Sequence, residues 1–447
     1  MKDMHIQNSK VAVALDIGTT KICAIAGRLN EYGKIEILGV GTVKSEGVSR
    51  GVVINIDKTV RSIRDAVEIA ERNAGLKIKK VHVGIAGQHI KSLHHHGLLT
   101  RDNALTEISQ ADVDKLIKDM HKLVLPPGVA ILHVIPQEFT VDDERDIMDP
   151  VGMSGIRLEA NFHIITGQIT ASRNLAKCVE KAGLGIANLT LEPIASSSAV
   201  LNSEEMEAGV ALVDIGGGTT DVTVFKDGII RHTGVIPFGG HVITKDIQAG
   251  CSVLINQAEK LKVKFGSALA DEIFDNRIIT IPGINGREPS EISEKNLARI
   301  IQARVEEIFD QVMFEIKRSG YEDKLLAGMV LTGGGSMLRH IDLLSNYHTT
   351  MHTRIGQPIE HLAHGYTKQL ASPKYATAVG LLKNSIDNDT TSEYVEMEGV
   401  PSIERGELVE AISGDTGFEN GRKEEKWIKK LFDMTKDFFD PKPDSDF

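Results

Sequence analysis

The chain has 447 residues, of which 41% are hydrophobic and 25% are charged, and its formal net charge is −11. This composition favours a globular protein of about two to four domains, and the acidic balance excludes a broad electrostatic attraction to nucleic acid. The three cysteines are widely spaced and form no Cys-x-x-Cys pair, which argues against a disulfide framework or a zinc site. No stretch approaches the roughly 18 uncharged apolar residues that a membrane-spanning helix needs.

The first half of the chain alternates predicted strands and helices. Strands over 11–17 and 21–29 form a predicted hairpin. A helix over 58–74 follows, with one apolar face and a glycine just after its end. The pattern changes over residues 86–165, where a helix over 106–123 lies among short strands. We therefore expect α/β layers with an inserted subdomain.

The second half opens like the first. A helix over 169–182 leads to a second predicted hairpin over 209–225, and a later helix spans about 296–318. Residues 384–422 are strongly acidic and have no clear period. This composition predicts a disordered acidic linker, and a poorly patterned packed segment is the alternative.

Helical periodicity returns over residues 423–440. On a helical wheel the apolar side chains fall within an arc of about 160°, and most charged ones fill the other side. The apolar face carries Trp427, Ile428, Leu431, Phe432, Phe438 and Phe439, and the polar face carries Lys426, Lys429 and Lys430. An acidic tether, a tryptophan and lysines are typical of a helix that lies on an anionic membrane surface. Docking onto the protein's own core, or into a groove of a partner, is the alternative.

Two segments about two hundred residues apart share one pattern, an apolar strand that ends in Asp, followed by Gly and then by hydroxyl side chains. The first copy contains Asp16, Gly18, Thr19, Thr20 and Lys21, and the second contains Asp214, Gly216, Gly217, Gly218, Thr219 and Thr220. Glycine permits the positive φ angles that aim backbone N–H groups at one point, so each turn can bind phosphate oxygens. The strand-end carboxylates of Asp16 and Asp214 suit Mg²⁺ held through water.

The alternative for these turns is a pair of ordinary tight hairpins, which the duplication disfavours. The sequence contains neither a Walker loop nor a Gly-x-Gly-x-x-Gly string, so P-loop and dinucleotide-binding folds lose support. A third glycine-rich turn follows an apolar strand at 330–332 and consists of Gly333, Gly334, Gly335 and Ser336. Its bare backbone would let a flat adenine ring approach, although a plain strand-to-helix turn has the same pattern.

Together with the Leu191-Glu192-Pro193 connection and the helix after Tyr375, these turns resemble the superfamily of actin, heat-shock chaperones and sugar kinases. Over residues 11–383 the chain is similar to the FtsA family of bacterial cell-division proteins. The resemblance implies an α/β chain with the actin-like ATPase fold, built from two RNase H-like lobes, an inserted α+β subdomain and a C-terminal amphipathic helix. It divides the folded part into a first lobe (1–85 and 166–207), an inserted subdomain (86–165), a second lobe (208–241 and 323–383) and a small subdomain (242–322).

The resemblance also implies roles for site residues. Glu259 and Lys262 would approach the ribose and adenine of ATP, with the Gly333–Ser336 turn beside them. Glu192 would position or activate the attacking water, a general-base role, and a helix-capping carboxylate before Pro193 is the alternative. ATP with Mg²⁺ would act mainly as a polymerisation switch, with slow hydrolysis at most.

The implied partners are those of a peripheral membrane protein at the cytoplasmic side of the division septum. They are the C-terminal tail of the filament protein FtsZ, further copies of this chain, later division proteins and an anionic lipid surface. A PilM-like pilus-assembly protein and a small-molecule kinase of the same superfold are the alternatives. A chaperone would need a substrate-binding domain after Lys383, which a mostly acidic tail of about sixty residues cannot form.

Overall fold

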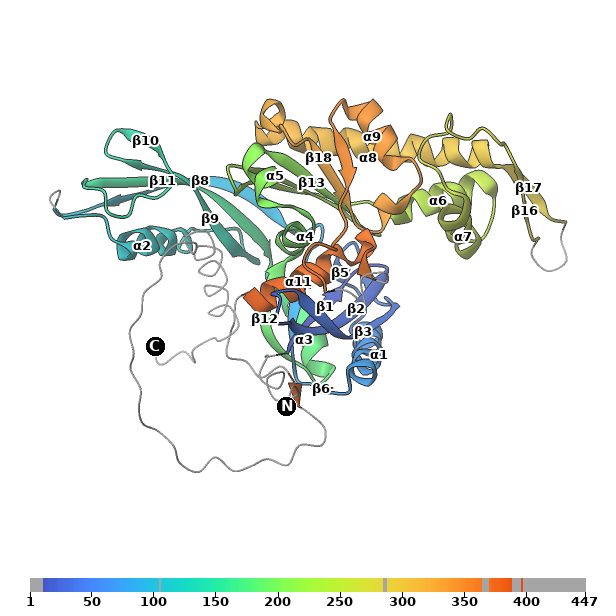
Figure 1. The fold of residues 1–447 in the computed structure, drawn as a ribbon, viewed down its shortest axis with the longest axis horizontal. Coiled ribbons are helices and arrows are strands. Elements are labelled where there is room, and N and C mark those ends of the chain that lie inside the picture. The colour runs from blue at the N-terminus through green and yellow to red at the C-terminus, as the bar shows by residue number, and fades with distance from the viewer. Residues whose placement is uncertain (1–10, 104–105, 284–287, 364–369, 388–394, 397–447) are drawn as a thin grey trace.

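The computed structural model describes residues 11–103, 106–283, 288–363, 370–387 and 395–396. These residues form two lobes, each built around a five-stranded sheet, with a separate four-stranded sheet at one end of the molecule and a small hairpin at the other (Figure 1). The fold is the actin-like fold that the sequence predicts.

The first lobe contains a sheet with the strand order β12-β7-β1-β2-β3. The strands are β1 (Ala12–Ile17), β2 (Lys21–Leu29), β3 (Ile35–Lys44), β7 (Lys80–Ile85) and β12 (Gly185–Leu191). β1 pairs antiparallel with β2 and parallel with β7. Every residue of β1 is buried, because helices cover both faces of the sheet. The covering helices are α1 (Ile56–Ala74) and α3 (Ile169–Lys181), which pack on each other, and α11 (Ala376–Asp387).

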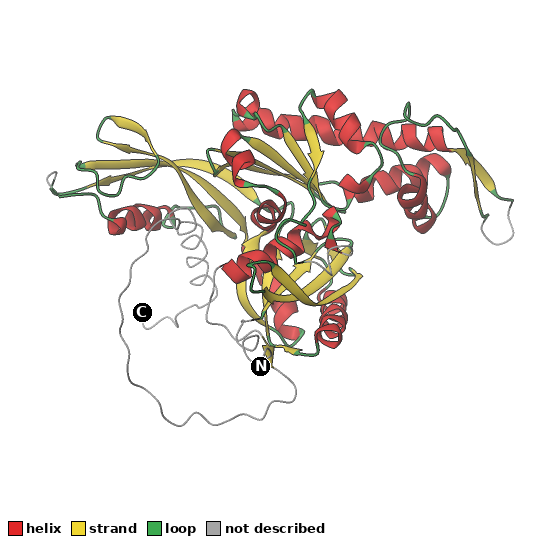
Figure 2. Cartoon of the chain, viewed as in Figure 1, coloured by secondary structure: helices red, strands yellow, loops and turns green. Residues whose placement is uncertain are grey.

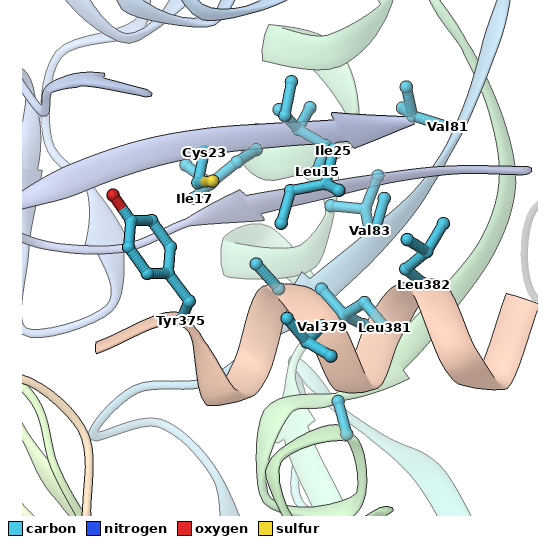
Figure 3. Close-up of a cluster of buried hydrophobic side chains, with 14 of the residues drawn as sticks. Leu15, Ile17, Cys23, Ile25, Val81, Val83, Tyr375, Val379, Leu381 and Leu382 are labelled. Carbon is cyan, nitrogen blue, oxygen red and sulfur yellow. The ribbon is translucent and has the colours of Figure 1, made fainter. Parts of the chain in front are cut away.

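Helix α11 packs against β1, β2 and β7 and also against α4 (Glu192–Val200). Figure 3 shows α11 beneath the strands, with Tyr375 at its start beside Ile17 and Cys23. The contact with α4 is very close, since a Cβ at Gly380 would lie 1.7 Å from the carbonyl oxygen of Ala195. The two helices therefore form one tightly packed pair where the lobes join.

The second lobe repeats the arrangement of the first. Its sheet order is β15-β14-β13-β18-β19, and β13 pairs antiparallel with β14 and parallel with β18. The strands are β13 (Val210–Ile215), β14 (Thr220–Lys226), β15 (Ile229–Ile236), β18 (Met329–Thr332) and β19 (Thr353–Ile355). The two Asp-Ile-Gly turns thus occupy equivalent positions in equivalent sheets. The internal match in the sequence reflects a structural duplication.

A group of helices extends the second lobe at the end that carries the small hairpin. The long helix α8 (Glu294–Ser319) packs along β14 and β15 and also contacts α6 (Gly240–Cys251) and α7 (Ile255–Phe265). The hairpin consists of β16 (Ile278–Ile281) and β17 (Ser290–Ser293), and α9 (Ile341–Thr349) packs on α8 and β19.

The four-stranded sheet has the order β10-β9-β11-β8, with helix α2 (Gln110–Met120) packed against β8 and β9 (Figure 2). The strands are β8 (Lys91–Thr100), β9 (Val129–Val141), β10 (Glu144–Ile147) and β11 (Arg157–Gln168). This part of the chain has its own core, which includes Leu116, Leu158 and Phe162.

Short elements complete the described chain. They are β4 (Val48–Ser49), β5 (Val52–Val53), β6 (Lys77–Ile78), α5 (Ser203–Ala208), the 3-10 turns η2 (Glu322–Lys324), η3 (Gly335–Met337) and η4 (Pro373–Tyr375), and β20 (Val395–Glu396). No helix in the described ranges combines the length and the apolar character that a membrane crossing requires.

Both hairpins predicted from the sequence are confirmed, and the predicted helices differ mainly at their ends. Helix α1 begins at Ile56, earlier than predicted, because the side chain of Asn55 accepts a hydrogen bond from the Lys58 backbone. Helix α2 begins later than predicted, because Ser109 and Asp112 form a capping box.

The linker predicted from residue 384 begins too early. Helix α11 continues to Asp387 and buries Asn384 and Ser385, because this last turn still packs on the first lobe. Further along, Val395 pairs with Ile78 of β6. The remaining linker and the helix predicted over 423–440 lie outside the described residues.

Candidate nucleotide site

The two Asp-Ile-Gly turns, one from each lobe, touch each other directly. A Cβ at Gly217 would lie 2.2 Å from Cγ2 of Thr20, and a Cβ at Gly218 would lie 2.6 Å from Oγ1 of Thr19. These distances leave no room for any larger residue at either position. The fold therefore joins the two predicted half-sites into one.

The structure corrects the reason that the sequence suggested for these glycines. Gly333 has a positive φ of 81°, but Gly18, Gly216, Gly217 and Gly218 do not. The N–H of Gly18 donates to the carbonyl of Lys21 at 3.0 Å, and that of Gly216 to the carbonyl of Thr219 at 2.9 Å. These two N–H groups close their own turns, so neither contributes to an anion nest. Close approach between the lobes, not backbone handedness, requires the glycines at 217 and 218.

Three of the four threonine hydroxyls also bond within the protein. Thr19 accepts from the backbone N–H of Gly51 at 3.2 Å, and Thr220 donates to the carbonyl of Phe238 at 3.0 Å. Thr219 donates to the carboxylate of Asp221 at 3.3 Å. Thr20 is the exposed member of the set. The hydroxyls at 19, 219 and 220 therefore hold the turns in shape.

Four carboxyl groups gather around these turns with one lysine. Asp16 and Asp214 lie near the ends of β1 and β13, and Asp221 lies near the start of β14. Glu192 begins α4, and Lys21 forms an ion pair with Asp16. Burial alone would lower the pKa of Lys21, but the charge of Asp16 raises it above its ordinary value. One permanent cation therefore faces several carboxyls.

This excess of negative charge raises the pKa values of several of these carboxyl groups. Burial, and then the charges of Asp16, Asp221 and Asp214, raise the pKa of Glu192 well above its ordinary value. Burial, followed by the charge of Asp214, raises the pKa of Asp221 to about 8. Burial also raises the pKa of Asp214. Such a group favours a further positive charge.

Asp221 is a site residue that the sequence reasoning did not single out. It lies directly opposite Asp214 across the β13–β14 hairpin. In the first hairpin the partner of Asp16 is Cys23, so the two half-sites differ at this position. Counting the antiparallel register outward from the turn would have found it.

Glu192 faces the carboxyl groups of Asp16, Asp214 and Asp221 and does not cap a helix. The N-cap residue of α4 is Leu191, and no side-chain bond caps that end. The Glu192 side chain packs against Gly84, where a Cβ would lie 2.9 Å from its Cγ. The capping alternative is therefore wrong, whereas a role in positioning water stays a prediction.

Glu259 and Lys262 are linked to the second turn through the start of α6. Lys262 pairs with Glu259 at 2.8 Å and donates to the carbonyl of Gly240 at 2.8 Å. The N–H of Gly240 in turn donates to the carbonyl of Gly216 at 2.9 Å. The structure thus brings this predicted pair next to the second turn.

The third glycine turn packs against the end of β13. A Cβ at Gly333 would lie 2.2 Å from Oδ1 of Asp214, and one at Gly335 would lie 2.3 Å from Cγ2 of Ile215. At Gly334 the nearest atom would be 4.0 Å away, so this glycine leaves open space. Ser336 is buried and donates to the carbonyl of Gly333 at 2.8 Å, which closes the turn.

The four neighbouring carboxyl groups of Asp16, Asp214, Asp221 and Glu192 suit a hydrated cation better than a directly ligated one. Within the described ranges, no three His, Cys, Asp or Glu side chains are close enough together to ligate one ion. Oδ1 of Asp221 is buried and has no hydrogen-bond partner, an arrangement that costs free energy unless a donor such as a bound water completes it. Asp16, Asp214 and Asp221 therefore fit an ion such as Mg²⁺ that keeps its water shell.

The predicted membrane-facing side chains lie outside the described residues. They are Trp427, Ile428, Leu431, Phe432, Phe438, Phe439, Lys426, Lys429 and Lys430.

Comparison with known proteins gives one consistent result. The family model of cell division protein FtsA matches residues 211–380, and the model of the SHS2 domain inserted in FtsA matches residues 87–166. The cell division protein FtsA of Pseudomonas aeruginosa is 39% identical over 395 residues, which cover 88% of this chain and 94% of the relative. That of Neisseria meningitidis is 41% identical over 428 residues, covering 95% and 100%. That of Escherichia coli K12 is 35% identical over 432 residues, covering 95% and 98%.

Among solved structures, the PilM-PilN type IV pilus biogenesis complex contains a similar chain. The TM-score is 0.60 with 14% sequence identity, and the match covers 84% of this chain and 98% of that one. At this identity the likeness shows a shared fold.

Proposed function

We propose that this chain, which belongs to the FtsA family of cell division proteins, binds ATP with Mg²⁺ between its lobes and anchors FtsZ filaments to the cytoplasmic face of the membrane. The observation that carries the nucleotide part is the direct contact of Gly217 with Thr20. A ligand bound where two lobes touch interacts with both of them, so its presence changes the relation between the lobes.

The residues around the turns would share the binding of ATP. Lys21 and the backbone N–H groups of both turns other than those of Gly18 and Gly216 would hold phosphate oxygens, and Asp16 and Asp214 would hold hydrated Mg²⁺. Glu259, Lys262 and the Gly333–Ser336 turn would line the ribose and adenine. The bound ion would supply the positive charge that these neighbouring carboxyl groups favour.

Hydrolysis would be slow at most, and the nucleotide would act as a polymerisation switch. Glu192, buried among the other carboxyl groups at the start of α4, is the candidate for positioning the attacking water. Self-assembly on the membrane would add avidity to a weak terminal anchor.

The small subdomain proposed over 242–322 would bind the C-terminal tail of FtsZ. It presents large apolar side chains to solvent, with Phe274 at 88% and Val263 at 76% exposure. Contiguous exposed apolar surface marks binding sites, and these two side chains are the contacts proposed for the FtsZ tail. The inserted subdomain over 86–165 would take part in self-association and in recruiting later division proteins. The predicted helix over 423–440 would hold the protein at the septum membrane.

A PilM-like role has weaker support than an FtsA-like one. The pilus-complex chain shares only 14% identity with this chain, whereas the three FtsA relatives share 35 to 41% over most of it. Fold alone does not fix function.

Two measurements test the proposal. Asp214→Ala should abolish most Mg²⁺-dependent ATP binding, and wild-type affinity in this variant would refute the site. Phe274→Asp should prevent co-pelleting with an FtsZ tail peptide. Tyr347→Asp, which changes a side chain with 86% exposure on α9, is the matched control and should leave co-pelleting unchanged.

A further inference from the structure

The Asp214 carboxylate is gripped by two hydroxyl groups from the helices that join the lobes. Oδ2 of Asp214 accepts from Oγ of Ser196 at 2.8 Å and from Oγ1 of Thr377 at 3.4 Å. The two hydroxyls are also 3.0 Å apart. Ser196 belongs to α4 and Thr377 to α11, so residues from three separate parts of the chain meet at one oxygen atom.

These hydroxyls engage only one side of the carboxylate. Both bond to Oδ2, and Oδ1 lies against the bare side of Gly333, where a Cβ would come within 2.2 Å of it. A hydrogen bond to a charged group is stronger than one between neutral groups and fixes its orientation. The carboxylate is thus held in one rotamer, with Oδ1 not engaged by the hydroxyls.

Both helices also contact the first lobe's half of the site. Glu192 lies one turn before Ser196, so the two side chains share a face of α4. Tyr375 ends η4 directly before α11, and the centroid of its ring is 5.6 Å from Nζ of Lys21. Because α4 and α11 pack so closely at Gly380, a shift of Asp214 would be passed to the pair of helices.

We propose that Ser196 and Thr377 form a two-hydroxyl clamp that positions Asp214 for cation-dependent nucleotide binding and couples that binding to the helix pair α4–α11. The inference rests on the proposed ATP site and adds to it two positioning residues. Neither hydroxyl is required to touch the nucleotide.

If the clamp exists, the Mg²⁺-dependent part of the ATP affinity depends on the two hydroxyls. ATP affinity is measured with Mg²⁺ and with EDTA for the wild type, Ser196→Ala, Thr377→Val and the double variant. The double variant should lose about tenfold in affinity with Mg²⁺ and little with EDTA. Thr377→Ser, which keeps the hydroxyl, should stay close to the wild type. Ser198→Ala is the control, since Ser198 lies on the same helix but donates to the carbonyl of Ala195.

A second readout follows the helices themselves. Saturating Mg²⁺-ATP should slow amide hydrogen exchange in α4 and α11 of the wild type, and this protection should be smaller in the saturated double variant. Equal losses of affinity with Mg²⁺ and with EDTA in the double variant would overturn the clamp, as would full helix protection in the saturated double variant. An unchanged affinity in Asp214→Ala would instead remove the proposed site on which the clamp rests.

Discussion

Gly217 and Thr20 meet across the two lobes so closely that any side chain at 217 would overlap the Thr20 methyl group, which lies 2.2 Å from an ideal Cβ. The other Thr20 atoms near that Cβ are at 3.2 and 3.3 Å. One methyl group therefore accounts for most of the expected clash.

Gly217→Ala should push the two turns apart and weaken ATP binding, at a cost of about 1 to 3 kcal/mol for overpacking. Thr20→Ser removes the methyl group and should restore much of the loss in the Gly217→Ala background. Titration of ATP binding in the two single variants and the double variant measures this coupling. Additive effects in this cycle would show that the two residues do not touch.

Arg231 connects the second lobe to the inserted subdomain. Its fully buried side chain pairs with Glu138 of β9 and, at 3.0 Å, with Asp227. Arg231→Ala should lower the free energy of unfolding by about 2 kcal/mol, because it removes a large buried side chain together with its charge-assisted hydrogen bonds. Urea unfolding measures the change. Arg318→Ala, at an exposed position, should stay within about 0.5 kcal/mol of the wild type, and an equally small loss at Arg231 would contradict the prediction.

Stability should fall in mild acid because His82 is buried as a neutral ring. Its Nε2 lies 2.5 Å from Oγ1 of Thr190, and burial lowers its pKa to about 4. In the unfolded chain the His82 ring binds a proton below about pH 6.5. The stability gained from burying the neutral ring is therefore complete above that pH and is lost as the pH falls toward 4. The loss at pH 4 is about 3 kcal/mol. In urea titrations between pH 7 and 4, His82→Gln should flatten the pH dependence, whereas His95→Gln, at an exposed position, should leave it unchanged.

Membrane attachment should depend on the apolar face of the predicted terminal helix. Trp427→Asp combined with Phe438→Asp should abolish co-sedimentation with vesicles that contain anionic lipid, because each change places a charge on the face that enters the lipid. Phe418→Asp, in the predicted acidic linker, is the control. Retained binding in the double variant would refute the anchor.

Much of the fold was predictable because its signals are local. Strand periodicity and turn residues lie within a few positions of each other, so both hairpins and the helices α1, α2, α3 and α8 could be predicted before any contact was known. Helix ends were less predictable, because Asn55 and Ser109 decide them through single capping bonds.

The sequence by itself determined that two equivalent Asp-Ile-Gly turns exist and that an ATP site is a reasonable expectation for them. Only the tertiary structure decided which atoms meet there. Asp221 entered the site through strand register, and Ser196 and Thr377 through the packing of two helices that are distant in sequence. It also showed that Gly217 is needed for contact with Thr20 and not for a positive φ angle. Local pattern fixes the elements, but side chains of high sequence separation meet only after those elements have packed.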